Sequence, residues 1–125
     1  MPISPTILLV RVKLGAWTLA ATLIISVPAI AKVLEGGGGA DSLRGTANAD
    51  RIDGRGGDDE IDAGAGRDRI IGGAGFDQIL AGKGRDLIRA RDGEPDSIDC
   101  GEGNDRVYID VTEDGVYDCE EVIEP

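Results

Sequence analysis

Aliphatic residues recur every ninth position along most of this chain, and an aspartate stands two positions before each of them. One extra residue interrupts the spacing between Asp86 and Asp96. A period of nine fits neither the 3.6 residues of a helical turn nor the alternation of a strand, so it indicates a repeat architecture. The pairs are Asp41–Leu43, Asp50–Ile52, Asp59–Ile61, Asp68–Ile70, Asp77–Ile79, Asp86–Ile88, Asp96–Ile98, Asp105–Val107 and Asp114–Val116.

Glycines follow the same period and mark sharp turns. They precede the aspartates, where positive φ angles cost glycine no steric energy. Three residues centred on each aliphatic residue, such as 69–71, predict a short strand, and the six residues between strands predict a turn. Two nine-residue units then complete one flattened coil, and stacked coils lie about 4.8 Å apart. Residues 18 apart in the sequence are therefore expected to be neighbours.

This stacking predicts an all-β fold, a right-handed parallel β-roll (a β-helix or solenoid) of nonapeptide repeats. Its core is two inward ladders of aliphatic side chains. One ladder contains Leu43, Ile61, Ile79 and Ile98 and is extended by Val116; the other contains Ile52, Ile70, Ile88 and Val107.

Composition excludes several classes of function. The 24 acids and 13 bases give a net charge of −11, and there is no histidine. Without histidine there is no Ser–His or Cys–His nucleophile pair and no histidine-ligated zinc. The acidic excess argues against a nucleic-acid partner, which requires clustered Lys and Arg. Aromatic residues make up only 3% of the chain, so its stability must come from something besides ordinary hydrophobic burial.

The N-terminal segment has the three parts of a secretory signal peptide. Arg11 and Lys13 precede an uncharged apolar run from Leu14 to Val27, and Ala29-Ile30-Ala31 offers a small-residue cleavage site. We expect cleavage after Ala31 and a secreted or cell-surface location for the mature chain.

The predicted domains are a signal peptide over 1–31 and a repeat domain over 32–125. Within the second, the repeats cover about 36–116 and a C-terminal cap covers 117–125. An uncleaved membrane anchor is the alternative for the first segment, although its apolar run is shorter than the ~20 residues that span a bilayer. No membrane span is expected in the mature chain.

Both cysteines lie in the part expected to be exported, and an oxidising compartment favours a disulfide between Cys100 and Cys119. They are 19 residues apart, about one coil, and neighbours at strand spacing suit the ~4.4–6.8 Å Cα separation that a disulfide requires. The bond would staple a C-terminal cap, which a solenoid needs because its last coil has no neighbour. A catalytic or metal-binding thiol pair is the alternative.

Stacking also gathers the aspartates into two rows, one on each edge of the coil. Like charges held this close repel by about 1 kcal/mol per pair even in water. Calcium suits such rows, since it takes six to eight oxygen ligands at about 2.3–2.6 Å and tolerates irregular geometry. Aspartates of adjacent coils and carbonyls of the tight turns supply such oxygens. Mg²⁺ suits them less well because it demands a strict octahedron.

The unit pattern G-G-x-G-x-D-x-U-x, where U is a large aliphatic residue, resembles the RTX (haemolysin-type) calcium-binding nonapeptide repeat, and the chain is most similar to short secreted members of that family. Segments 54–61 and 72–79 show the pattern best. The resemblance covers about residues 36–116 and implies a ligand set of repeat aspartates and turn carbonyls. The implied metal ligands are Asp41, Asp50, Asp59, Asp68, Asp77, Asp86, Asp96, Asp105, Gly37, Gly39, Gly54, Gly57, Gly64, Gly66, Gly73, Gly75, Gly82 and Gly84.

The expected function is extracellular binding of roughly two to six calcium ions, with folding of the roll coupled to calcium and no enzymatic activity. A cell-surface or matrix adhesion or spacer module is the alternative, and a carboxylate-based hydrolase is a more distant one. A protein or polysaccharide partner cannot be named from the sequence.

Three segments depart from the repeat. In 45–53, Thr46, Ala47 and Asn48 replace glycines, with Asn48 expected to tolerate a left-handed conformation. The turn 90–95 carries the inserted residue and is expected to bulge. Residues 110–121 loosely fit an EF-hand loop, but that motif needs a flanking helix on each side, and a degenerate ninth repeat is preferred.

Overall fold

A computed structural model describes residues 30–110 and 115–125. The predicted signal peptide, apart from its last two residues, and Asp114 of the ninth repeat lie outside the described residues. From Ala31 to Pro125 the chain forms one unit, whose described residues form thirteen strands and no helix. Accordingly, no helix suited to crossing a membrane is found in that part of the chain.

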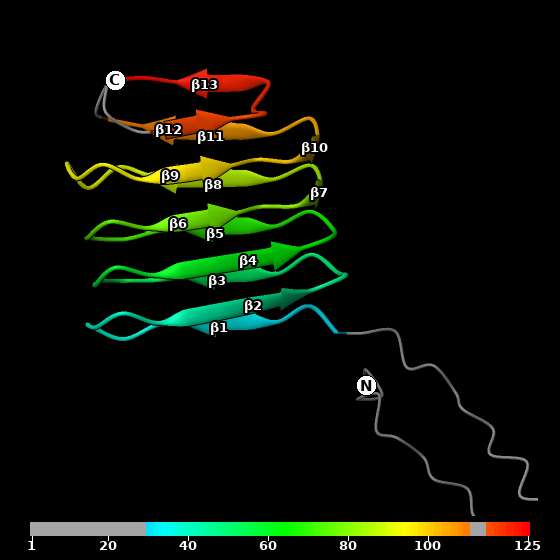
Figure 1. Ribbon diagram of the computed structural model, residues 1–125. Helices are drawn as coiled ribbons and strands as arrows, with labels where there is room; N and C mark the ends of the chain where they lie inside the picture. Colours follow the sequence, from blue (N-terminus) through cyan, green and yellow to red (C-terminus); the bar gives the residue numbers. More distant parts are fainter. Residues whose placement is uncertain (1–29, 111–114) are drawn as a thin grey trace, which may run out of the picture. The chain divides into compact units, whose positions relative to one another are not determined.

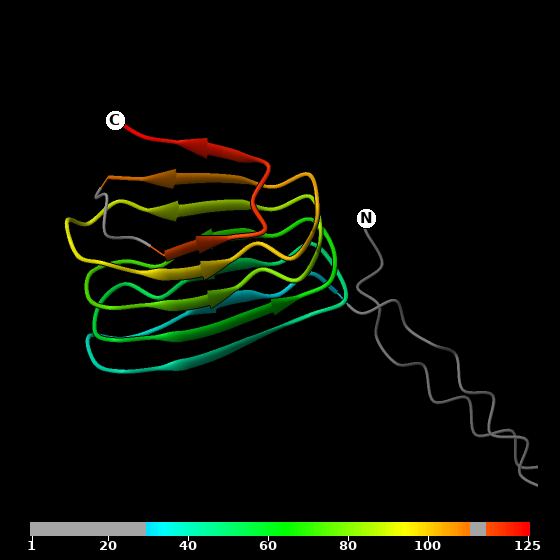
Figure 2. The same ribbon diagram turned by 45° about the horizontal axis from the view of Figure 1, so that its top comes forward.

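The strands stack into two parallel sheets that face each other, and the chain alternates between them (Figures 1 and 2). Sheet A contains β1 (Val33–Glu35), β3 (Arg51–Asp53), β5 (Arg69–Ile71), β8 (Leu87–Ala90), β11 (Arg106–Ile109) and β13 (Glu121–Ile123). Sheet B contains β2 (Ser42–Thr46), β4 (Glu60–Gly64), β6 (Gln78–Leu80), β9 (Ser97–Asp99) and β12 (Gly115–Tyr117). A short pair, β7 (Lys83–Gly84) and β10 (Glu102–Gly103), joins two turns. The predicted parallel roll, with two repeat units per coil, is confirmed.

The register confirms both aliphatic ladders. In sheet B, Ile61 pairs with Leu43 on one side and Ile79 on the other, and in sheet A, Ile70 pairs with Ile52 and Ile88. The central members of both ladders are at most 1% exposed. Val116 extends the sheet B ladder by pairing with Ile98, as expected.

The sheet A ladder is longer than expected at both ends. Leu34 pairs with Ile52 at its start and Val122 pairs with Val107 at its end. These two residues escaped the sequence pattern because no aspartate stands two positions before either of them. Lys32 and Glu120 occupy those places instead.

A second inward position lies two residues after each ladder residue. Ala63, Ala81, Ala90 and Cys100 occupy it and are all 0% exposed. Strand alternation places this residue on the same face as the aliphatic residue. This second inward residue was expected to open the turn, because it follows the predicted three-residue strand. The structure places its side chain in the core.

The predicted disulfide is present. Cys100 and Cys119 are bonded, with Cα atoms 5.1 Å apart. Cys100 is in the second inward position after β9, where other coils carry alanine, and Cys119 lies just before β13. The bond therefore fastens the segment leading to the last strand onto the core of the preceding coil.

The inserted residue stays in a turn and leaves the ladders intact. Strand β8 ends at Ala90 and β9 begins at Ser97, which pairs with Gln78 across the insertion. The turn between these strands projects farther than those of the other coils (Figure 1), as expected. The EF-hand alternative for residues 110–121 is wrong, because strand β11 precedes this segment, strand β12 lies within it and strand β13 begins at its last residue, where the motif requires a helix on each side.

Candidate calcium site

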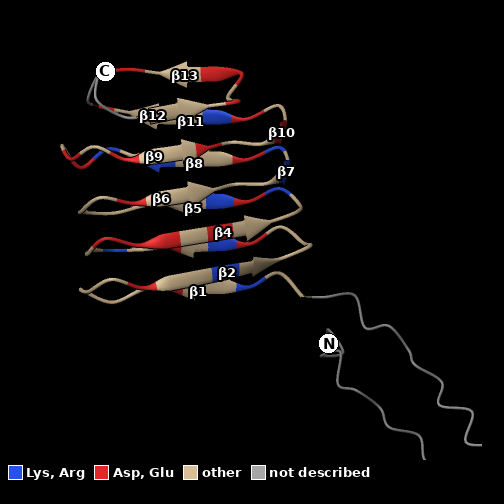
Figure 3. Cartoon of the chain, viewed as in Figure 1, with Lys and Arg blue, Asp and Glu red and all other residues tan. Residues whose placement is uncertain are grey.

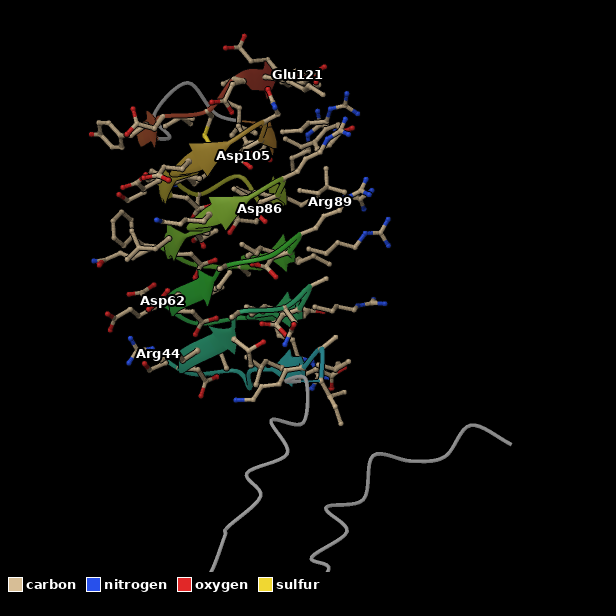
Figure 4. The ribbon with its side chains drawn as sticks, turned by 90° about the vertical axis from the view of Figure 1, so that its right-hand side faces the viewer. Arg44, Asp62, Asp86, Arg89, Asp105 and Glu121 are labelled. Carbon is tan, nitrogen blue, oxygen red and sulfur yellow. A yellow bond between two sulfur atoms is a disulfide. The ribbon has the colours of Figure 1, made fainter. Side chains whose placement is uncertain are left out.

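The repeat aspartates lie inside the roll, at the two edges of its flattened coil where each turn meets the next strand. Asp86 and Asp105 are marked in Figure 4. The two expected rows are present, and from Asp50 to Asp105 every repeat aspartate is at most 3% exposed. One row contains Asp41, Asp59, Asp77 and Asp96, and the other contains Asp50, Asp68, Asp86 and Asp105.

From Asp50 to Asp105, one carboxylate oxygen of each repeat aspartate accepts a backbone N–H from the preceding coil. The backbone N–H of Asp50 donates to Oδ1 of Asp68 (2.7 Å), and that of Asp68 donates to Oδ1 of Asp86 (2.7 Å). The same bond recurs in the other row, for example from Asp59 to Asp77 (2.9 Å). It continues across the insertion, from Asp77 to Asp96 and from Asp86 to Asp105. Each aspartate therefore links two coils through Oδ1 and leaves Oδ2 for another partner.

In the first coil, the protein itself supplies that partner. The backbone N–H of Gly37 donates to Oδ2 of Asp41 (2.5 Å), and that of Thr46 donates to Oδ2 of Asp50 (2.5 Å). The Thr46 hydroxyl adds a further hydrogen bond to Asp50. In both carboxylates, Oδ2 thus accepts a hydrogen bond from the backbone of its own turn.

Later coils differ because the residue at the same turn position adopts a positive φ. Arg55 has φ 72° and Gly73 has φ 100° there, and Gly64, Gly82 and Gly101 are similar. In these turns the carboxylate oxygen has no protein donor. Buried Oδ2 atoms without a hydrogen-bond partner among the described residues belong to Asp59, Asp68, Asp77, Asp86 and Asp105. An unpartnered buried carboxylate oxygen is costly, and a cation ligated by oxygen would remove that cost.

The turn glycines are required by close packing between coils. Gly75 has φ +116° and Gly84 has φ +134°, and a Cβ at either residue would overlap the backbone of the turn one coil earlier. At Gly72 the obstacle is the carboxylate of its own turn, since a Cβ there would lie 2.6 Å from Oδ2 of Asp77. Of the glycines expected to act as ligands, those with positive φ are Gly57, Gly64, Gly66, Gly73, Gly75, Gly82 and Gly84.

The turns of the first coil do not share this geometry. Gly37, Gly39 and Asn48 do not have the positive φ of their counterparts in later coils. Asn48 therefore does not use the left-handed conformation that an asparagine tolerates. The N–H groups of Gly37 and Thr46 donate to Oδ2 of Asp41 and Oδ2 of Asp50, which explains why these two oxygens have a partner.

Burial raises the pKa of the central aspartates. The pKa of Asp68 and that of Asp77 rise to about 6, and that of Asp86 rises to about 7, chiefly because burial disfavours the charged form. The carboxylate one coil away raises each pKa further, while the backbone N–H bonded to Oδ1 opposes the rise. For Asp50 burial also acts to raise the pKa, but hydrogen bonds from Lys32 and Thr46 outweigh it and lower the pKa.

These pKa values predict that the folded state of the calcium-free chain becomes less stable as the pH rises. The folded pKa of Asp86 exceeds the unfolded value of 3.8, so the folded state binds more protons and its stability falls as the pH rises through the interval from about 4 to 7. We expect the β content of the chain in EDTA to increase when the pH is lowered from about 7.5 to about 5, as measured by circular dichroism.

Two variants control this prediction. Asp86→Asn removes one carboxyl group whose pKa is raised, and it is expected to reduce the pH dependence of the β content. Asp62→Asn, at an exposed ion pair with Arg44, is expected to preserve that dependence. A β content that falls on acidification would contradict the prediction.

Glu120 takes the place of a repeat aspartate in the last coil. The N–H of Asp105 donates to Oε2 of Glu120 (2.7 Å), as the N–H of Asp86 donates to Oδ1 of Asp105 (2.7 Å). Glu121 pairs with Arg106 in the sheet, so Glu120 is in register with Asp105. Glu120 escaped the sequence pattern because it follows Asp105 by 15 residues instead of 18. Its position two residues before Val122 was the available signal.

Acidic side chains alone do not build a metal centre in the part of the chain that the structure describes. There, no group of three or more Asp, Glu or Cys side chains converges closely enough to hold a metal ion. The donor set at each edge is instead carboxylate oxygens flanked by turn carbonyls. Hard oxygen donors of this kind suit calcium.

A family model of the RTX calcium-binding nonapeptide repeat (4 copies) matches residues 35–70 and 62–95. The repeat region, residues 35–95, belongs to the RTX repeat family. RTX repeats imply calcium binding in a β-roll, and members of the family are typically non-catalytic and typically secreted. No curated protein and no solved structure matches the chain. The described roll continues past the matched segment, where Asp105 and Glu120 accept the hydrogen bonds that repeat aspartates accept in earlier coils.

Proposed function

We propose that this RTX protein is an extracellular calcium-binding module whose roll folds when calcium binds. Its signal peptide would cover 1–31 and its calcium-binding domain 32–125. The observation that carries the proposal is the set of five buried Oδ2 atoms without a hydrogen-bond partner, at Asp59, Asp68, Asp77, Asp86 and Asp105. Buried carboxylates are stable when a cation or enough donors compensate them, and calcium is the cation that the repeat family implies.

The strongest proposed ligands are therefore the five aspartates of the later coils, together with carbonyls of the turns that carry them. Asp96 joins them by its place in the same row. Asp41 and Asp50 are weaker candidates, because backbone N–H groups already occupy their Oδ2 atoms. We assign those two to closing the first coil by hydrogen bonds.

Glu120 completes the second row of proposed ligands. It accepts the hydrogen bond that a repeat aspartate accepts elsewhere, and it faces Asp105, whose Oδ2 is buried without a hydrogen-bond partner. Burial and the nearby charge of Glu120 both raise the pKa of Asp105. A cation between coils would relieve both effects, so the last calcium site would use Asp105 and Glu120.

Calorimetric titration with calcium tests this ligand set. We expect Asp86→Asn and Glu120→Gln each to lower the number of bound ions by about one, or to weaken affinity about tenfold, because each removes a charged oxygen ligand. Asp62→Asn and Glu124→Gln change the net charge equally but lie outside the proposed sites, and they are expected to titrate like the unchanged chain.

The two test variants report on separate claims. If Asp86→Asn binds calcium with unchanged number and affinity, the proposed role of the repeat aspartates is wrong. If only Glu120→Gln behaves like its control, the last site does not use Glu120, and the row ends at Asp105.

A further inference from the structure

The outer face of sheet A carries a row of arginines that point away from the core. Arg51 and Arg69 are direct partners on β3 and β5, and Leu87 follows Arg69 in the same row on β8. Beside this row, Arg89 pairs with Ile71. Figure 3 shows basic segments on successive strands of this sheet. In Figure 4, Arg89 projects from one side of the roll while Arg44 and Asp62 lie on the other. We call the surface formed by Arg51, Arg69, Ile71, Leu87 and Arg89 the arginine face.

At three places outside this face, an exposed cation is paired with an acid one coil away. Arg44 lies 3.4 Å from Asp62, Lys83 lies 3.6 Å from Glu102, and Arg106 lies 2.7 Å from Glu121. In all three cases the two residues are direct partners in the sheet or turn ladder.

The arginine face lacks such ion pairs between adjacent coils. Arg51 is opposite another arginine, and among the described residues none of Arg51, Arg69 and Arg89 has an ion-pair partner. Like charges on neighbouring strands are destabilising. Arg67 and Arg85, both exposed on the adjoining turns, add further positive charge beside it. One acid, Asp53, borders this face as the ladder partner of Ile71. Its Oδ1 accepts a hydrogen bond from the backbone N–H of Arg55, and it forms no ion pair with the arginines of the face among the described residues.

The face is also hollowed. A depression of about 160 Å³ is lined by Arg51, Arg69, Arg89 and the half-buried side chains of Ile71 and Leu87. Guanidinium groups thus surround an apolar floor. Guanidinium binds carboxylate and sulfate groups through two parallel hydrogen bonds, and the apolar floor suits the C–H face of a sugar ring.

We infer that the arginine face binds a linear acidic polysaccharide, whose anionic groups recur along the polymer as the arginines recur along the roll. A nucleic acid fits less well, because single strands use exposed aromatic platforms for base stacking. Tyr108, the aromatic residue on this sheet, is half-buried and carries the guanidinium groups of Arg91 and Arg89 over its ring, at 5.2 and 6.0 Å from its centroid.

This inference rests on the proposed calcium binding in one respect. The acidic chain repels a polyanion at long range, and each bound Ca²⁺ adds two positive charges that offset this repulsion. Stacking of the coils also brings Arg51, Arg69 and Arg89 together. Polymer binding is therefore expected only when calcium is present.

The test uses the full chain in calcium, with dextran sulfate as the probe and uncharged dextran as the backbone control. The variant R51Q/R69Q removes two charges from the arginine face, and R44Q/K83Q removes two charges from outside it. We expect R51Q/R69Q to lower affinity for dextran sulfate about tenfold and to reduce its salt dependence, while R44Q/K83Q changes affinity less than about twofold. Circular dichroism and a calcium titration of the same samples verify that each variant still folds and binds calcium.

The inference is overturned if dextran sulfate binds no better than dextran, or if both double variants lose affinity equally. Tighter binding of a single-stranded DNA oligonucleotide would overturn the polysaccharide assignment. Sedimentation that shows self-association lost only in R51Q/R69Q, without polymer binding, would assign the face to a second copy of the chain. Failure of the calcium titration itself would count against the proposed function, whereas calcium binding without polymer binding would count only against the arginine face.

Discussion

Addition of millimolar calcium to the chelator-treated chain at neutral pH is expected to convert a coil-like circular dichroism spectrum into that of a β protein. The core offers one large aliphatic side chain per nine residues, which is little apolar burial against the entropy of ordering the chain. The central carboxylates add a further cost, because their pKa values of about 6 to 7 show that burial disfavours their charged form. Metal binding would thus supply folding free energy.

Magnesium at the same concentration is the control for this experiment. It should produce a much smaller change, since it requires strict octahedral geometry and dehydrates reluctantly. A midpoint for the calcium response in the range of about 10⁻⁴–10⁻³ M would match extracellular calcium modules. A spectrum that calcium leaves unchanged, or that magnesium changes equally, would contradict calcium-coupled folding.

Replacing Gly84 with alanine is expected to lower the free energy of unfolding of the calcium-loaded roll by about 3–5 kcal/mol, as measured by urea denaturation. Gly84 has φ +134°, which side-chain-bearing residues rarely adopt, and a Cβ there would overlap the carbonyl oxygen of Gly66 in the coil before. The coils would have to separate locally, which would disturb the neighbouring Asp86.

Gly38→Ala is the matched control. No atom lies within 4 Å of a Cβ built at Gly38, so this variant is expected to stay within about 0.5 kcal/mol of the unchanged chain. Equal urea midpoints for Gly84→Ala and Gly38→Ala would show that the close packing of left-handed turns does not limit stability.

Much of the fold follows from spacing alone. A nine-residue period with two units per coil makes residues 18 apart neighbours, so the ladders through Ile61 and Ile70, the two aspartate rows and the Cys100–Cys119 bond were all predictable. Parallel strands impose this register, and the inserted residue in 90–95 shifts it by one without breaking it. The signal peptide and the domain boundaries stay predictions.

The coil ends were less predictable. Leu34 and Val122 extend the sheet A ladder although no aspartate stands two positions before either of them. Before Val122 that place is taken by Glu120, whose side chain is longer and which follows Asp105 by 15 residues instead of 18. A period identifies regular members of a repeat, whereas the terminal coils keep the contacts and lose the spacing. Cys100 was likewise predicted to form a disulfide but not to fill a core position occupied by alanine in other coils.

The sequence by itself determined which residues stack in the regular coils, because stacking there follows their separation along the chain. Only the tertiary structure decided which hydrogen-bond and ion-pair partners each stacked side chain has. It distinguished Asp41, whose second oxygen accepts an N–H, from Asp77, whose second oxygen is buried without a donor. It also left Arg51 and Arg69, which the 18-residue register stacks, without an ion-pair partner among the described residues. Hydrogen bonds and ion pairs depend on direction and on distances of a few ångströms, which turn conformation and coil packing set and which a repeat period does not encode.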